Sequence, residues 1–189
     1  MGIARKNNKK GFTLLEVVVV LSLFAIIVPA MFTMYFASLR AQKKVFVLRD
    51  TKRNGDNALT VIESLIKQNA VSVHNATPPT TANQVCTSLV TSSSAVPLYF
   101  KDKDGTWFSF TQVSNKIASH SGSLSGTTTV QLTNSKSIVS GFDVRCIYVS
   151  ELSPPLVSIS FDLNQNGPTG RPEDVSSLSY QTKVKLRSY

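Results

Sequence analysis

A long apolar run near the N-terminus constrains this chain more than any other feature. Residues 12–36 read FTLLEVVVVLSLFAIIVPAMFTMYF, and Glu16 is the only charged residue among them. As a helix, about 25 residues span about 38 Å, enough to cross the roughly 30 Å hydrocarbon layer of a membrane. A strand would leave its main-chain groups unpaired in lipid, so the sequence predicts a helix that crosses the membrane once.

The flanks of this run are basic. Residues 1–11 hold four basic residues and no acidic one, and such a flank tends to stay in the cytoplasm. Residues 40–53 are basic as well, so charge alone leaves the orientation open. A secretory signal usually has an apolar region of about 7–15 residues followed by a small-residue cleavage site, which does not fit this longer run. A plain single-span anchor is the simplest interpretation.

Glu16 does not fit a plain anchor. A carboxylate costs about 2.5–3.5 kcal/mol at mid-membrane and less near the edge, so a charge inside an apolar segment points to a function. The segment Lys10-Gly11-Phe12-Thr13-Leu14-Leu15-Glu16 resembles the class III signal of type IV pilins and type II secretion pseudopilins. That signal has a short basic leader, Gly before the scissile bond, usually Phe after it, and Glu four positions further on. The resemblance implies that a prepilin peptidase cleaves after Gly11 and N-methylates Phe12.

The resemblance also implies how the chain assembles. In this family the glutamate pairs with the N-terminal amine of a neighbouring subunit, so Glu16 is expected to set the register of the filament. An unpaired carboxylate is costly in a low dielectric, and a paired one much less so. The implied partners are prepilin peptidase, other pilin subunits, the pilus assembly platform and inner-membrane lipid. We expect a single-pass cytoplasmic-membrane protein with an extracytoplasmic head, which later joins an extracellular or periplasmic filament.

Pro29 lies inside the apolar run. Proline removes one helical hydrogen bond and clashes with the preceding turn, so a kink or locally melted segment is expected near Val28. A proline in this region resembles the place where pilin helices loosen on assembly. A harmless bend in a membrane helix is the alternative.

The positive charge is concentrated at the N-terminus. The formal net charge is +9, of which residues 1–56 supply +7 and residues 57–189 only +2. A broadly basic nucleic-acid-binding domain is therefore not expected, and nucleic acid is an unlikely partner. The basic stretch from residue 40 to 53 suits either a solvated helix face or contact with headgroups or neighbouring subunits.

Residues 37–70 show apolar spacing typical of an amphipathic helix that continues the membrane helix. Gly55 is expected to break or bend this helix, and Asp56 or Asn57 to cap a second segment. The predicted organisation is a leader at residues 1–11, an apolar transmembrane or filament-core helix at 12–36, the amphipathic helix at 37–70 and a β-rich head at 71–189. The expected fold is α+β and pilin-like, with one long N-terminal helix packed on a C-terminal antiparallel sheet.

The head contains short runs of alternating apolar residues separated by turn residues, a pattern typical of antiparallel strands. The candidate strands are Val96 to Lys101, Thr106 to Val113, Thr128 to Thr133, Ile138 to Ser150, Leu156 to Leu163 and Ser177 to Arg187. The sequence KDKDG reads as a hairpin turn. The Ser/Gly/Thr-rich segment from Ser119 to Thr129 is expected to be a mobile loop. The closing segments resemble those of larger minor pilins and pseudopilins.

Cys86 and Cys146 both lie in the head. In an oxidising compartment a disulfide that closes about 60 residues would contribute about 4 kcal/mol. Two buried free thiols are the alternative.

The segment from Asp162 to Glu173 matches the spacing of an EF-hand calcium loop, with Asp162, Asn164, Asn166 and Glu173 as candidate ligands. The sequence has no second helix after the loop, and it contains two prolines. Calcium is thus the one cofactor that the sequence suggests. The alternative to a calcium site is a strand-connecting loop with an Asn-Gly turn.

Catalytic chemistry has little support in this sequence. His74 and His120 lie on polar segments without a metal or nucleophile motif, and we expect both to be solvated. Trp107, Phe108 and Phe110 are expected to be core and cross-strand residues rather than a stacking platform for bases. The sequence therefore does not predict an enzyme, and its resemblance to the type IV pilin family implies a minor pilin or pseudopilin. The alternatives are a membrane-anchored binding or sensor ectodomain and a filament-tip adhesin or DNA-uptake subunit.

Overall fold

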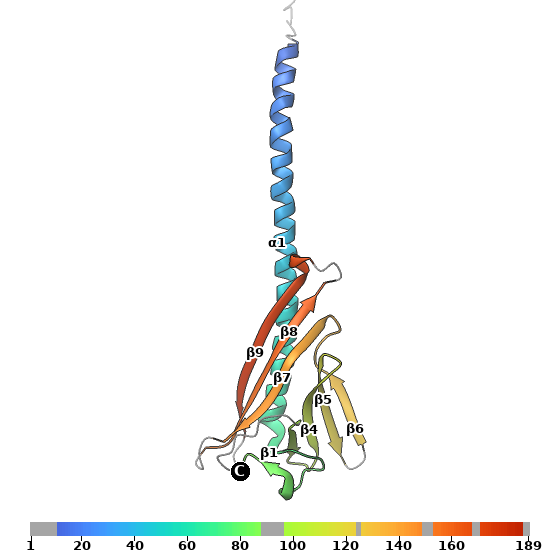
Figure 1. The fold of residues 1–189 in the computed structure, drawn as a ribbon, viewed down its shortest axis with the longest axis vertical. Coiled ribbons are helices and arrows are strands. Elements are labelled where there is room, and N and C mark those ends of the chain that lie inside the picture. Colours follow the sequence, from blue (N-terminus) through green and yellow to red (C-terminus); the bar gives the residue numbers. More distant parts are fainter. Residues whose placement is uncertain (1–10, 88–96, 124–125, 149–152, 168–170, 187–189) are drawn as a thin grey trace, which may run out of the picture. The chain divides into compact units, whose positions relative to one another are not determined.

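The computed structural model describes residues 11–87, 97–123, 126–148, 153–167 and 171–186. The chain forms two compact units, Met1–Gln42 and Lys43–Tyr189. One helix, α1 (Leu14–Asn69), opens the described chain, and its part within the second unit packs against antiparallel strands. The α+β, pilin-like architecture predicted from the sequence is confirmed (Figure 1).

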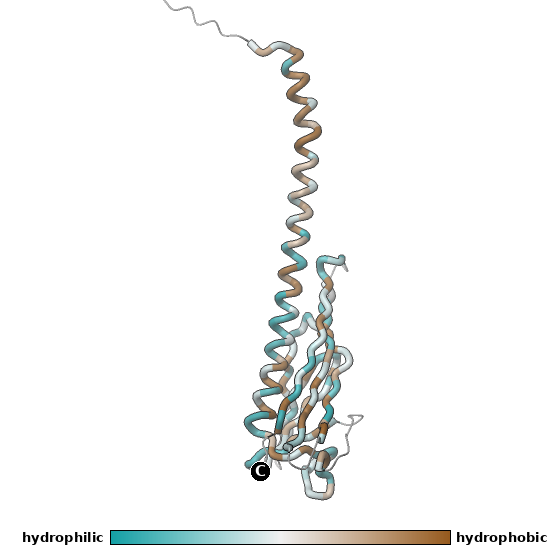
Figure 2. The backbone as a smooth tube through the Cα atoms, turned by 90° about the vertical axis from the view of Figure 1, so that its left-hand side faces the viewer, coloured by the Kyte–Doolittle hydropathy of each residue, from teal (hydrophilic) through white to brown (hydrophobic). Residues whose placement is uncertain are grey.

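Helix α1 changes character along its length. Figure 2 shows that its N-terminal part is almost uniformly hydrophobic, whereas hydrophobic and hydrophilic residues alternate in its C-terminal part. Its buried residues are Val47, Thr51, Gly55, Ala58, Ile62 and Ile66. They recur every three or four residues, the spacing that places side chains on one face of a helix. The amphipathic part of the prediction is therefore confirmed.

The predicted break at Gly55 is wrong, because α1 runs through this residue without interruption. A Cβ atom added to Gly55 would lie only 2.2 Å from the ring of Tyr180. The Tyr180 hydroxyl donates a hydrogen bond to the carbonyl oxygen of Lys52 at 3.1 Å. Glycine is thus placed here for the close approach of a side chain, and not to end the helix.

The strands form two sheets. The first has the order β2-β1-β3-β4-β5-β6, and the second has the order β7-β8-β9, with every neighbouring pair antiparallel. The strands of the first sheet are β1 (Ala70–His74), β2 (Gln84–Val85), β3 (Tyr99–Asp102), β4 (Trp107–Val113), β5 (Lys116–Ser123) and β6 (Gly126–Gln131). Those of the second are β7 (Ser137–Ile147), β8 (Leu156–Asn166) and β9 (Val175–Lys185). Two short 3₁₀ helices, Thr81–Asn83 and Pro172–Asp174, lie in the connections.

Each of the six predicted strands is present with shifted ends, as β3, β4, β6, β7, β8 and β9. The KDKDG segment forms the predicted hairpin turn between β3 and β4, and Gly105 adopts a φ of +80° there. The prediction of a mobile loop from Ser119 to Thr129 is wrong for the residues that the structure describes. Residues 119–123 lie in β5 and residues 126–129 lie in β6, and these two strands pair with each other. The predicted ends at Val96, Ser150 and Arg187 lie outside the described residues.

A single buried cluster joins the C-terminal half of α1 to both sheets. In the first sheet, Phe100, Phe108 and Phe110 contact one another, with ring centroids 5.3–6.1 Å apart. In the second sheet, Phe161 stacks on Tyr180 at 5.0 Å. The prediction that Phe108 and Phe110 are core residues is confirmed, because both are buried.

Polar contacts fix the C-terminal half of α1 on the head. The hydroxyl of buried Thr51 donates to the Gln165 side chain at 2.9 Å. The carboxylate of Glu63 accepts hydrogen bonds from Thr182 of β9 at 2.5 Å and from Lys67 at 2.9 Å. Lys43 pairs with Asp174 at 2.5 Å. Each of these groups gains a specific partner, so the contacts define how the helix lies against β8 and β9 (Figure 1).

Candidate functional site

The N-terminal end of α1 is closed by two neighbouring polar side chains. Thr13 precedes the first helical residue, and its hydroxyl accepts a hydrogen bond from the main-chain N–H of Glu16 at 3.3 Å. The Glu16 carboxylate in turn accepts from the main-chain N–H of Thr13 at 2.9 Å and from its hydroxyl at 3.0 Å. This reciprocal arrangement is a capping box, which satisfies main-chain donors that a helix end leaves unpaired.

The predicted cleavage position lies just before this cap. Gly11, Phe12 and Thr13 are outside the helix and exposed, and Phe12 is 84% exposed. A methyl group added to Gly11 would meet no atom within 4 Å. The packing of the described residues therefore does not require glycine at this position, and a non-helical segment is accessible there.

The predicted membrane segment lies in the first unit. Within the described residues, α1 is the one helix long and apolar enough to cross a membrane, and none of that stretch is buried. The exposed residues include Leu14, Val18, Phe24, Ile27 and Phe32. The side chains on every face of this part of α1 are thus free to contact lipid or other helices.

Pro29 lies within α1, and the helix is continuous on both sides of it. No melted segment is present near Val28 in the single chain. Loosening of the helix at Pro29 during assembly stays a prediction.

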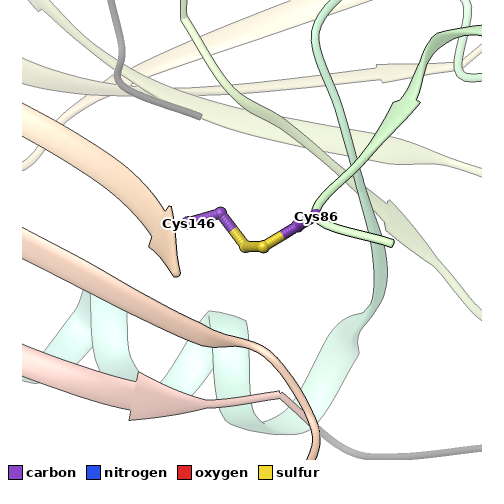
Figure 3. Close-up of a disulfide and its surroundings, with 2 residues drawn as sticks. All are labelled: Cys86 and Cys146. Atoms are coloured by element: carbon purple, nitrogen blue, oxygen red, sulfur yellow. A yellow bond between two sulfur atoms is a disulfide. The ribbon is translucent and has the colours of Figure 1, made fainter. Parts of the chain in front are cut away.

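The two cysteines form the predicted disulfide. The Cys86 and Cys146 sulfur atoms lie 2.00 Å apart, with a Cα–Cα distance of 6.1 Å (Figure 3). Cys86 follows β2 and Cys146 lies in β7, so the bond joins the first sheet to the second. Both residues are buried.

The four candidate calcium ligands are spread along an extended chain. Asp162, Asn164 and Asn166 are alternate residues of β8, and Glu173 lies in the 3₁₀ helix Pro172–Asp174. Alternate residues of a strand are about 6.6–6.8 Å apart, which does not wrap oxygen atoms around one ion. In the described parts of the chain, no three His, Cys, Asp or Glu residues are grouped as metal ligands. Calcium binding stays a prediction, and the strand geometry weighs against it.

The prediction that both histidines are solvated is wrong. His74 is only 2% exposed, and its Nδ1 lies 2.8 Å from Asn83 Oδ1. The Asn83 amide nitrogen donates to the carbonyl oxygens of Ala76 and Pro78. Sequence reasoning missed this pair, in which His74 and Asn83 organise the Pro/Thr-rich loop after β1.

His120 is half-buried on the first sheet and forms a ladder across three strands. Its Nε2 lies 2.7 Å from the Thr111 hydroxyl on β4, and its Nδ1 lies 2.9 Å from the Thr129 hydroxyl on β6. Alternating threonine and histidine on adjacent strands could have suggested this arrangement only if the strand register had been known.

Comparison with known proteins supports the N-terminal resemblance. Residues 6–28 match the family model described as the prokaryotic N-terminal methylation motif. This motif is the class III prepilin signal, and its match includes Gly11, Phe12 and Glu16. Neither a curated protein nor a solved structure matches the chain at a significant level. Together with the long apolar helix, the match is consistent with a type IV pilin-like chain and indicates a structural subunit.

Proposed function

We propose that this type IV pilin-like chain is a minor pilin or pseudopilin, a structural subunit of a type IV pilus-like filament. The observation that carries the proposal is the methylation motif at residues 6–28, which continues into the apolar N-terminal part of α1, a stretch of membrane-spanning length that is not buried. The choice of a minor subunit rests on the resemblance of the closing segments to larger minor pilins. The head determines which subunits the chain contacts in the filament. The exposed apolar part of the helix supplies most of the apolar surface that is buried there.

Processing would occur at the segment just ahead of α1. Prepilin peptidase cleaves after Gly11 and methylates the new terminus, Phe12. Exposure and lack of helical structure at residues 11–13 support this step, because a protease needs an extended, accessible chain. The processed subunit then stays in the cytoplasmic membrane through the first unit until the assembly platform adds it to the filament.

Glu16 would exchange one partner for another during assembly. In the single chain its carboxylate accepts hydrogen bonds from Thr13 and needs no neighbouring subunit. Cleavage places an α-amino group on Phe12, the residue directly before Thr13. An opposite charge from a neighbouring subunit stabilises a carboxylate more than neutral donors do, and water exclusion strengthens the attraction. The pair would therefore favour one register between neighbouring helices.

Two variants separate the charge of Glu16 from its capping role. Glu16→Gln keeps an oxygen that can accept from Thr13, since glutamine also serves in capping boxes, but it removes the charge. Thr13→Val removes the capping hydroxyl and keeps the charge. We expect Glu16→Gln to be cleaved and inserted in the membrane yet lost from filaments by about tenfold or more, the factor that corresponds to about 1.4 kcal/mol. Thr13→Val is expected to assemble at close to the wild-type level.

The measurement is the share of the protein that sediments with sheared filaments, relative to the share in the membrane, in cells that make the filament. Equal incorporation of Glu16→Gln and wild type would contradict the pairing role. Absence of both proteins from any filament would favour a membrane-anchored ectodomain instead.

A further inference from the structure

Strand β6 forms an exposed edge of the first sheet. The sheet order ends at β6, so one side of this strand pairs with β5 and no described strand covers the other. All six residues of Gly126–Gln131 are exposed, and Val130 is 55% exposed. An open edge presents a row of main-chain donors and acceptors, which another strand can pair with.

The hydrogen bonds of β6 show which of its main-chain groups face outward. The N–H of Leu132, directly after β6, donates to the carbonyl oxygen of Ile117 on β5. Main-chain groups of an antiparallel strand alternate between its two sides, so Val130 and Thr128 also face β5. Thr127, Thr129 and Gln131 therefore direct their N–H and C=O groups away from the sheet. With this alternation, Thr129 and His120 are opposite residues that exchange no main-chain hydrogen bonds. Side chains lie closer together in such pairs, which agrees with the contact between the His120 and Thr129 side chains.

The other described sheet edges are protected and β6 is not. Strand β2 has only two residues. Strand β7 carries Asp143 and Arg145, and the N–H of Val139 is already bonded to Asn115. Strand β9 exposes Lys183 and Lys185. Short length and charged side chains are the usual protection against edge pairing.

The sequence of β6, GTTTVQ, has the opposite character. It contains no charge and no proline, and four of its six residues are β-branched. Such residues favour strands. The edge is therefore long enough and suitable in composition to accept another strand.

We propose that β6 of a second copy of this chain adds to this edge as an antiparallel strand, in a register centred on Thr129. In this register Thr129 lies opposite Thr129 of the other copy, and Thr127 lies opposite Gln131. These are the outward-facing residues of both copies, so each pair can exchange two bonds and the edge gains about six main-chain hydrogen bonds. Thr128 lies opposite Val130, and no like charges meet.

In this register, corresponding faces of the two first sheets also lie on the same side of the combined sheet. A twofold axis perpendicular to the sheet keeps residues of the same parity on the same face. Thr127, Thr129 and His120 thus line one face across both copies, and the two first sheets become one continuous sheet. A register shifted by one residue would oppose inward-facing groups to outward-facing groups, so it would lose these bonds.

The twofold pairing also sets the direction of the two heads. Strand β6 runs broadly along the C-terminal half of α1 within the second unit (Figure 1). The twofold axis reverses the direction of β6 and of the C-terminal half of α1. In the pair, the C-terminal half of α1 in one copy therefore runs opposite to that in the other copy. Neighbours in a filament built from one repeated contact share a direction. If the proposed function is correct, the contact therefore joins heads of two different filaments.

Cysteine cross-linking of the full chain in detergent tests the register. The two native cysteines are bonded to each other, so an introduced cysteine is the free thiol of the chain. Thr129→Cys places two thiols on opposite residues whose Cα atoms are about 5.5 Å apart, a distance that a disulfide spans. Thr127→Cys is the matched control, because it lies on the same strand and face but opposite Gln131. We expect about tenfold more covalent dimer from Thr129→Cys than from Thr127→Cys after mild oxidation.

A mixture of Thr127→Cys and Gln131→Cys is expected to give the mixed dimer.

Thr129→Lys brings two like charges face to face, so it should sediment as a monomer where the wild type shows concentration-dependent dimers. Circular dichroism shows whether each variant is folded. A folded Thr129→Cys that gives no dimer, or equal dimer from Thr127→Cys, would overturn the proposal. These experiments use solubilised chains, so their failure would leave N-terminal processing and filament assembly unaffected.

Discussion

Gly55 and Tyr180 show how a single residue determines the contact between helix and sheet. The Tyr180 ring occupies the space above Gly55, stacks on Phe161 and donates to the carbonyl oxygen of Lys52. Burial of the hydroxyl, followed by the nearby charge of Asp56, raises the pKa of Tyr180 to about 12. The phenol therefore stays neutral to a higher pH than a free tyrosine does.

Gly55→Ala is expected to destabilise the protein by about 1–3 kcal/mol, because the added methyl group displaces the Tyr180 ring. This loss outweighs the gain of about 1 kcal/mol that alanine brings to a helix. Chemical denaturation of the purified chain measures the difference. In a Tyr180→Ala background the clash is absent, so the same substitution should become stabilising. A stabilising effect in both backgrounds would contradict the contact.

Glu63 links folding to pH. Hydrogen bonds from Thr182, then from Lys67, lower the pKa of Glu63 below its value of 4.5 in an unfolded chain. A group with a lowered folded pKa contributes stability that is present above pH 4.5 and is lost as pH falls through the folded pKa. We expect the wild type to lose more free energy of unfolding than Glu63→Gln when the pH is lowered from 7 to 3. Parallel losses in the two proteins would show that Glu63 does not carry this dependence.

Among the elements of the fold, the Cys86–Cys146 bond joins the two sheets across a sequence separation of 60 residues. Replacing both cysteines with alanine should reduce the free energy of unfolding by about 4 kcal/mol, mainly because the unfolded chain gains freedom. Thermal denaturation under non-reducing conditions measures this loss. An unchanged midpoint would show that the link adds nothing to the packing of the sheets.

The elements that the sequence predicted well are those with local causes. Helix α1 follows from an apolar run and from helical spacing within one segment, and the hairpin at KDKDG follows from its turn residues. Strand β5 was missed, and β6 was predicted to begin two residues too late, because the serine, glycine and threonine content of this region is typical of loops. Cross-strand neighbours decide their structure instead: Trp107 covers Gly122, and His120 bonds to threonines on both adjacent strands.

The same distinction holds for the candidate site. Gly11, Phe12 and Glu16 belong to one contiguous motif and were identified from the sequence. The capping box needs only Thr13 and Glu16 three residues later, so its signal was also present in the sequence. In contrast, the contact of Gly55 with Tyr180 and the burial of His74 depend on the fold of distant segments, for which no local pattern exists.

At the scale of the whole molecule, the two units have different tasks. The first unit holds the apolar part of α1, which the described residues leave unburied. The second has its own core of helix and sheet residues and a disulfide between its sheets. Such a division suits a subunit that is held in a membrane first and then buries its helix among those of other subunits.

The mass of the N-terminal peptide tests the central claim most directly. The protein should be extracted from membranes of its own cells, beside a Gly11→Ala variant whose fold is expected to be unchanged. The account predicts a wild-type chain that begins at Phe12 and carries one added methyl group, and a variant that keeps its leader. A wild-type chain that still begins at Met1, in cells with active prepilin peptidase, would contradict processing and with it the pilin-like role.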